Sequence, residues 1–255
     1  MMLEHVDSRV LAALRFVDAT IGSQVAASLE VVGPGVRVIR NRAGVHVLVE
    51  APGFNAYTAA FRDPPAVAAT SVALTVHDRG RRYLSRQVVV ALPRDPDPAH
   101  AGLDDSLFRT VEVPLYPAPA GSLGVGWAVL RLSIKRGATD QGLPYAYVRV
   151  VRDSDDELLA VGMADHRGEA LVTVAGIPVT SWNTTSTSTS PVVSSVAARV
   201  TAYFDPTAYD ENTGRWPDPD VFEQIFATLA HSAEQSFDLA SGHAEARRIS
   251  VPVPP

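Results

Sequence analysis

The sequence predicts a mainly β protein of two tandem antiparallel β-sandwich domains, the second of which has one inserted α-helix. Apolar side chains recur along short segments such as 170–174 with the period of two expected of a half-buried strand. Turns rich in Gly, Pro and Asp separate these segments, and short strands at such spacing are typical of an antiparallel sandwich. A similar pattern occurs twice in the 255 residues, which indicates two related domains.

The clearest pattern lies between Leu130 and Pro178. Four apolar segments there are predicted to be strands, at residues 129–134, 148–151, 158–163 and 170–174. The last two are joined by Asp165-His166-Arg167-Gly168, which we interpret as a turn and not as an acid–base site, because it links two strands.

Three motifs in this stretch point to a known kind of module. A strand leads into Ala138-Thr139-x-x-Gly142-x-Pro144, then Ala146-x-Val148-x-Val150, then Gly162-x-x-Asp165-x-x-Gly168. Residues 130–178 thereby resemble carboxypeptidase-regulatory-like, transthyretin-like or Cna-B-type β-sandwich modules. The resemblance implies an immunoglobulin-like or transthyretin-like fold and a role as a structural spacer, adhesive unit or accessory domain. Hydrolases of this family have a C-terminal Tyr-Arg-Gly-Ser motif, whereas residues 251–255 read Val-Pro-Val-Pro-Pro, so that activity is not carried over.

A second copy of the pattern lies near the N-terminus. The segment Leu14-Arg15-Phe16 precedes an Ala19-Thr20 link, as Leu130-Arg131-Leu132 precedes Ala138-Thr139. We therefore predict a duplication, with a first module over 1–120 and a second over 121–255, joined by the Pro- and Gly-rich residues 117–121.

The first module is expected to contain two hairpins and a closing edge strand. Its predicted strands are 11–18, 28–32, 36–40, 44–49, 72–76, 83–92 and 109–117. Prolines within the last of these favour an edge position, because proline cannot donate a ladder hydrogen bond.

The second module is expected to continue with a loop, a strand, a helix and a closing strand. Residues 180–195 are rich in Ser and Thr and predict an exposed loop, and 196–204 predict a strand. Apolar residues at helical spacing predict a helix over about 218–241, inserted before a last strand at 246–254.

Composition excludes several classes of protein. With 46% apolar and 20% charged residues the chain can bury a core, and its net charge of −6 disfavours binding to nucleic acid or to an anionic membrane. There is no cysteine, no legible signal peptide and no run of eighteen apolar residues. We therefore expect no membrane span, and a cytoplasmic protein or one within a particle released without a signal peptide.

No pattern in the sequence indicates catalysis, a metal or a cofactor. The acidic stretch 205–220 lacks the glycine position and closing Glu of a calcium loop, so its carboxylates are expected to cap turns. The seven histidines show no i, i+4 zinc pair, and no Gly-x-Ser-x-Gly elbow is present. We expect no catalytic, cofactor or metal residues, and no small-molecule ligand.

Two sets of residues are candidates for contact with other molecules. Arg79, Arg81 and Arg82, with Arg86 nearby, make a basic hairpin tip suited to an acidic neighbour subunit. Aromatic residues in or beside predicted loops and on the predicted helix form the second set, namely Trp127, Trp182, Trp216, Phe222 and Phe226.

These features favour a non-catalytic structural protein whose partners are other subunits of a larger assembly. A chain of paired regulatory-like modules without cysteine or signal peptide resembles accessory proteins of phage-tail-like contractile injection particles, such as a cap, collar or baseplate-associated subunit. One alternative is a module that binds carbohydrate or another surface ligand. It would use a stacking platform of Trp182, Trp216, Tyr203 and Tyr209. A second alternative is a metal-dependent or transthyretin-like hydrolase, which would need a convergent pocket of His and Asp side chains.

Overall fold

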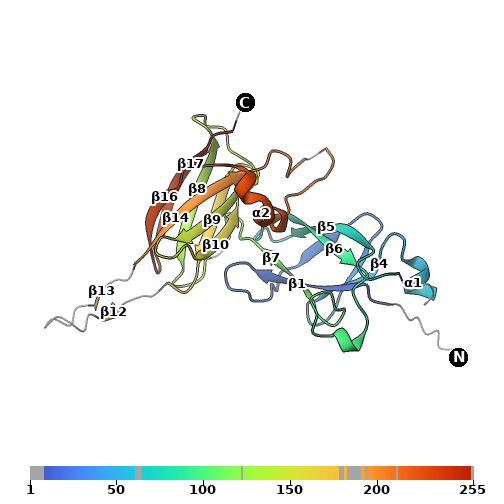
Figure 1. The fold of residues 1–255 in the computed structure, drawn as a ribbon. Helices are drawn as coiled ribbons and strands as arrows, with labels where there is room; N and C mark the ends of the chain where they lie inside the picture. The colour runs from blue at the N-terminus through green and yellow to red at the C-terminus, as the bar shows by residue number, and fades with distance from the viewer. Residues whose placement is uncertain are drawn as a thin grey trace. The chain divides into compact units, whose positions relative to one another are not determined.

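The computed structural model describes residues 9–60, 65–121, 123–177, 181–182, 191–192, 195–210 and 212–253, with side chains at all of these except 59, 60, 181, 182, 191 and 192. The chain is mainly β and divides into two compact units (Figure 1). The first consists of Met1–Val17, Ser23–Arg79 and Ser85–Leu115, and the second of Asp18–Gly22, Gly80–Leu84 and Tyr116–Pro255.

Unit 1 consists of two small sheets. The first has the strand order β3 (Arg37–Arg40), β4 (His46–Glu50), β1 (Ala12–Asp18), β7 (Val111–Leu115). The second has the order β2 (Leu29–Val32), β5 (Thr70–Asp78), β6 (Arg86–Leu92). Helix α1 (Asn55–Ala60) follows β4, and a 3-10 turn at Pro98–His100 follows β6. Strand β7 ends its sheet, which confirms the predicted proline-containing edge strand.

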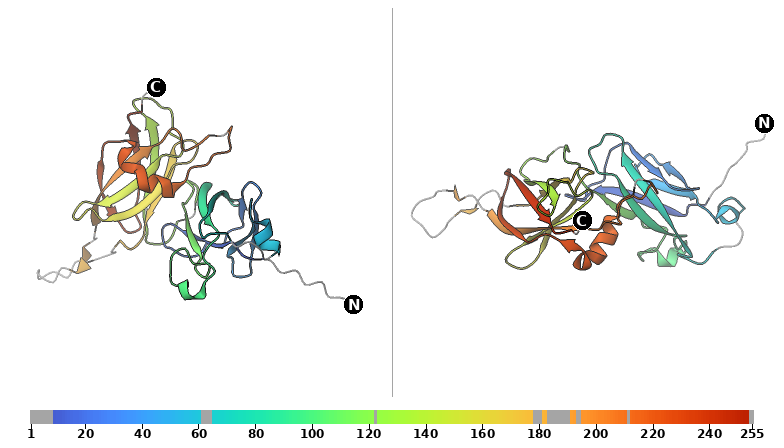
Figure 2. Two further views of the ribbon diagram at one scale, coloured as in Figure 1. Left: turned by 45° about the vertical axis from the view of Figure 1, so that its right-hand side comes forward. Right: turned by 90° about the horizontal axis from the view of Figure 1, so that it is seen from above.

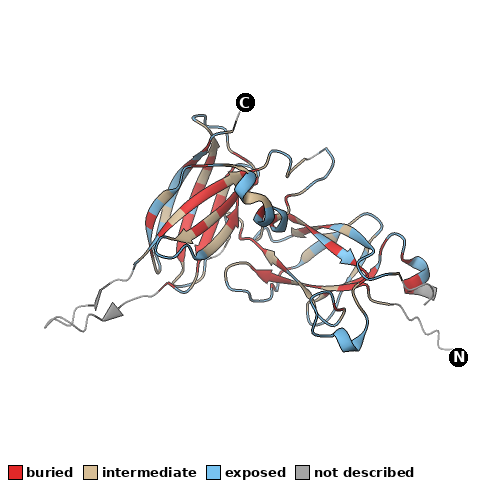
Figure 3. Cartoon of the chain, viewed as in Figure 1, coloured by how far each residue is buried: buried red, intermediate tan, exposed pale blue. Residues whose placement is uncertain are grey.

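The inner faces of these sheets form the core of unit 1. Along β6 the buried residues Val88, Val90 and Leu92 alternate with Gln87, Val89 and Ala91, which point outward. In each unit the buried positions concentrate in the strands and the exposed ones in the turns (Figure 3).

Unit 2 repeats this plan on a larger scale. One sheet has the order β11 (Glu169–Val174), β8 (Ala128–Arg136), β17 (Ala244–Val251). The other has the order β10 (Leu158–Met163), β9 (Tyr147–Arg152), β14 (Ser195–Phe204), and β14 pairs along its length with β15 (Ala230–His231) and β16 (Gln235–Ala240). The two-residue strands β12 (Ser181–Trp182) and β13 (Pro191–Val192) pair with each other.

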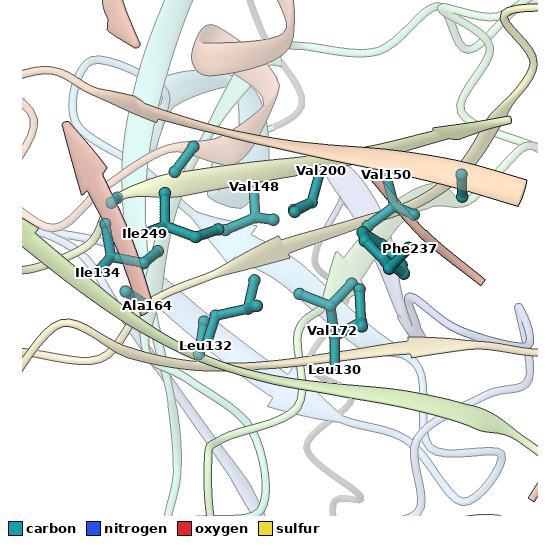
Figure 4. Packing of buried hydrophobic residues seen from close by; sticks show 14 of the residues in the cluster. Leu130, Leu132, Ile134, Val148, Val150, Ala164, Val172, Val200, Phe237 and Ile249 are labelled. Carbon is teal, nitrogen blue, oxygen red and sulfur yellow. The ribbon is translucent and has the colours of Figure 1, made fainter. Parts of the chain in front are cut away.

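The two sheets of unit 2 enclose a continuous apolar core. Leu130, Leu132 and Ile134 alternate along β8 and are at most 1% exposed. They face Val148 and Val150 of β9 across the interior (Figure 4). Burying one such side chain contributes about 1.5–3 kcal/mol, so this layer is the main source of stability in the unit.

The strand orders of the two units correspond. The order β4-β1-β7 in unit 1 matches β11-β8-β17 in unit 2, and β2-β5-β6 matches β9-β14-β16. Only the third strand differs, because β3 pairs with β4 whereas β10 pairs with β9. Two sandwiches with the same connection of strands support the predicted duplication.

Two predictions about unit 2 need correction. The sandwich is not wholly antiparallel, because β17 pairs in parallel with β8 from Ala244 opposite Val129 to Val251 opposite Arg136. The turn after β16 carries the chain to the other sheet, so β17 does not fold back as a hairpin.

The second correction concerns the inserted helix, which is shorter than 218–241. Helix α2 spans Pro219–Ile225 and is capped by Asp218, whose side chain accepts from the Asp220 N–H. A 3-10 turn at Phe226–Thr228 follows, and then β15 and β16. Residues 235–240 alternate buried Phe237 and Leu239 with exposed neighbours, a period of two that places them in the sheet. None of the described helices is long and apolar enough to span a bilayer.

His46 is an ionisable side chain inside the core of unit 1. It is 4% exposed, its ring meets Phe16 edge to face at 5.0 Å, and neither ring nitrogen has a hydrogen-bond partner among the described residues. Burial lowers the pKa of His46, and the nearby guanidinium of Arg40 lowers it further. The neutral imidazole is therefore the form that the folded unit accommodates.

We expect unit 1 to lose stability as the pH falls below about 6.5, the ordinary pKa of an unfolded histidine. Below this pH the imidazole of His46 binds a proton in the unfolded chain but stays neutral in the folded unit. The free energy of unfolding therefore decreases with falling pH. Denaturant unfolding of the wild type and of His46→Leu between pH 5 and 8 measures this effect. The variant should have a flatter profile, and parallel profiles would refute the role of His46.

Candidate functional site

The outward face of strand β9 is covered by the chain that connects β14 to β16. Ala146, Val148 and Val150 point inward and are completely buried, so Tyr145, Tyr147 and Arg149 lie on the opposite face. Helix α2 lies against this face (Figure 2). We call the residues that pack here the aromatic cover, namely Tyr145, Tyr147, Arg149, Tyr203, Tyr209, Trp216, Phe222, Glu223, Phe226 and His231.

Phe222 and Glu223 hold α2 on the sheet. The Phe222 ring stacks on that of Tyr147 with the centroids 5.5 Å apart and an interplanar angle of 6°, and Phe222 is only 2% exposed. The Tyr147 hydroxyl donates to the Glu223 carboxylate, which also forms an ion pair with Arg149. The Arg149 guanidinium lies 3.9 Å from the Phe226 ring centroid.

Burial raises the pKa of Tyr147, and its hydrogen bond to the Glu223 carboxylate raises it further. Tyr147 is therefore a neutral donor and not a phenolate. These contacts pair the Tyr147 hydroxyl, the Arg149 guanidinium and the Glu223 carboxylate with one another and hold α2 on the sheet.

The other aromatic residues form two clusters beside this contact. Tyr209 and Trp216 meet at 5.5 Å and both contact Tyr145, at 4.4 and 5.9 Å respectively. Tyr203 contacts Phe226 at 5.4 Å and His231 at 5.8 Å. The structure thus places Tyr203 in a different cluster from Trp216 and Tyr209, and they do not make one stacking platform. The side chain of Trp182 lies outside the described residues.

The predicted interface on the helix is corrected by these contacts. Phe222 is buried against Tyr147 within its own unit, so it is not available to a partner. Phe226 and Trp216 are half-buried in the same cover. Trp127 packs instead against Gly124, where a Cβ atom would lie 2.2 Å from the indole ring.

Asp205 and Asp210 of the acidic stretch 205–220 cap turns, and Asp218 caps α2. Asp205 accepts from the Thr207 N–H at 2.8 Å, and Asp210 accepts from the Thr213 hydroxyl at 3.0 Å and the Asn212 N–H at 2.9 Å. These hydrogen bonds lower the pKa of Asp210, with that from Thr213 the strongest. Among the described residues no group of three His, Asp or Glu side chains is placed to hold a metal ion.

The basic hairpin tip is the loop between β5 and β6, and it contains three exposed arginines. Arg79 lies with its Nε 3.4 Å from the Glu30 carboxylate, while Arg81 and Arg82 follow in the turn. Arg86 does not belong to this tip. It is completely buried, and its guanidinium donates to the carbonyls of Gln87 and Pro114.

The sequence pattern did not identify the residues of β9, and those just before it, that form part of the aromatic cover. Arg149 lies in the predicted strand 148–151, Tyr145 and Tyr147 precede it, and the sequence-based predictions give none of the three a role on the outward face. Large side chains at every second position were the available signal, because a strand with apolar residues on one face and aromatic residues on the other needs a second covering layer.

No protein-family model matches the chain, and no curated protein matches it. Among solved structures, the Bacillus anthracis TIE protein is similar over 96% of this chain and 34% of its own length, with 10% identity and a TM-score of 0.28. The shaft pilin spaA of Lactobacillus rhamnosus GG is similar over 98% of this chain and 100% of its own, with 9% identity and a TM-score of 0.25. This chain spans about a third of the first of these proteins. Likenesses at such TM-scores decide neither fold nor function, so the β-sandwich assignment rests on the sheets described above.

We expect Phe222→Ala to lower the free energy of unfolding of unit 2 by about 3–5 kcal/mol, because it removes a buried aromatic ring from the contact with Tyr147. Val221→Ala is the matched control, since Val221 is 45% exposed on the same helix and should change stability by less than about 0.5 kcal/mol. Denaturant unfolding measures both. Equal effects of the two substitutions would mean that α2 does not pack through Phe222.

Proposed function

We propose that the protein is a non-catalytic structural subunit that binds other proteins of a larger assembly. The observation that carries this proposal is the loop between β5 and β6, where Arg79, Arg81 and Arg82 are exposed on a chain of net charge −6. Arginine forms bidentate contacts with carboxylates and is enriched at protein interfaces. An acidic surface of a neighbouring subunit is the partner that this loop fits.

We further propose that the assembly is a phage-tail-like contractile particle, with this chain as a cap, collar or baseplate-associated subunit. The support is the resemblance of residues 130–178 to regulatory-like modules and the presence of two such sandwiches in tandem. The protein would then occur in the cytoplasm or within the released particle. Sedimentation of a native-host lysate tests this, because the chain should co-sediment with sheathed particles. Recovery only as a small species would refute it.

Reversing the charge of the arginine loop should weaken this docking. We expect Arg81→Glu with Arg82→Glu to reduce the fraction that co-sediments with the large complex at least tenfold, because like charges would face the acidic partner. Wild-type association should also weaken as salt rises. Arg37→Glu is the matched control, since Arg37 is exposed on β3 in another part of the chain. Unchanged co-sedimentation of the double variant would exclude the loop as the contact.

The second candidate function is binding of a carbohydrate or another surface ligand. Its support is the half-buried pair of Tyr209 and Trp216, two of the four residues predicted for a stacking platform, whose rings lie 5.5 Å apart. Aromatic rings of this kind present apolar faces to sugar rings.

If this second function holds, Trp216→Ala should abolish glycan-array binding. Tyr203→Ala, in the other cluster, should leave that binding within about twofold of wild type. Absence of any glycan signal from the wild type would remove this candidate while leaving the docking proposal intact.

A further inference from the structure

In the part of the chain that the structure describes, the outward face of sheet β2-β5-β6 in unit 1 has no counterpart of helix α2, which lies on the matching sheet of unit 2. In unit 2 the chain between β14 and β16, residues 205–234, supplies α2 and its aromatic residues. Further along β14, Arg199 forms ion pairs with Asp153, Asp156 and Glu234 on the same outward face. The corresponding connection, between β5 and β6, is residues 79–85, which contain no helix.

This outward face carries one charged residue on its strands, Glu30 of β2, which lies opposite His77 and 3.4 Å from the Nε of Arg79. On β5 the outward residues are Ser71, Ala73, Thr75 and His77, and on β6 they are Gln87, Val89 and Ala91. None of them is Asp, Glu, Lys or Arg. Val89 is 50% exposed and Val32 of β2 is 45% exposed, so large apolar side chains meet solvent here.

Strand β6 also forms the edge of this sheet. In the part of the chain that the structure describes, β6 pairs with β5 only, so its second row of backbone groups faces away from the sheet. Proteins usually protect such edges with charged side chains or prolines. The counterpart β16 has the exposed Asp238, whereas the sole charged residue of β6, Arg86, points into the core.

The side-chain pattern of β6 is compatible with antiparallel pairing between the β6 strands of two copies of this chain. In an antiparallel pair centred on Val89, Gln87 lies opposite Ala91 of the second strand, and Val88 lies opposite Val90. No two like charges meet, and a two-fold interface requires such self-complementarity. The buried residues Val88 and Val90 of both strands would face the same interior side.

We propose that two copies of this chain associate through β6, antiparallel and centred on Val89. The two three-stranded sheets then form one sheet of six strands, in which the edge hydrogen bonds are satisfied and Val89 packs against its symmetry mate. This association does not depend on the proposed function, because it requires only the purified protein.

The first test is the mass in solution of the wild type and of Val89→Lys, measured by light scattering across a concentration series. The wild type should be a dimer, and Val89→Lys should be a monomer with a dissociation constant at least tenfold higher, because two lysines would lie directly opposite each other. Val89 points outward, so the melting temperature of unit 1 should stay within a few degrees of wild type. Ser236→Lys, at an exposed position of β16, is the matched control and should remain dimeric.

The second test uses the absence of cysteine from the chain. Val89→Cys should form a disulfide-linked dimer on mild oxidation, since residues at the centre of an antiparallel pair have Cβ atoms about 4.5–5.5 Å apart. Gln87→Cys should not, because its copies would be offset by four residues, about 13 Å along the strands. A monomeric wild type, a dimer unaffected by Val89→Lys, or cross-linking at position 87 in place of position 89 would each overturn the proposal.

Discussion

The fold of each unit depends on two sheets that pack against each other through the apolar side chains of their central strands. In unit 2, Leu130 and Leu132 of β8 pack against Val148 and Val150 of β9, with β14 beside them. Because side chains alternate along a strand, fixing this inner face also fixes which residues point outward. The aromatic residues of β9, the open face of β6 and the buried position of Arg86 all follow from that alternation.

The two sandwiches have corresponding strand orders, but the side chains on their outward faces differ. In unit 2 the outward face contains Tyr147, and a connection long enough to supply α2 covers it. The connection between β5 and β6 is short, and the outward residues of these two strands are small or uncharged. The described polar side chains of the acidic stretch stabilise turns, and the arginine loop and the β6 edge are the surfaces that we propose for contact. Both suit association with proteins.

Much of the fold was predictable because it is encoded locally. The period of two in Ala170 to Val174, the turn at Asp165 and the repeated Leu-Arg and Ala-Thr pattern all reflect short-range constraints. The extent of the helix was not predictable by the same means. Residues 221–230 match a helical period, but pairing with β14 takes the following chain into strands, and such long-range pairing overrides local spacing.

The sequence by itself determined that the chain is two tandem sandwiches and that Arg79, Arg81 and Arg82 lie in an exposed turn, since strand alternation and turn residues act over a few positions. Only the tertiary structure decided that Phe222 is buried, that Arg86 lies in the core, that β17 runs parallel to β8 and that β6 ends its sheet. Those outcomes depend on which strands pair and which sheet faces pack together. Such contacts join residues that are distant in the sequence, so local patterns do not determine them.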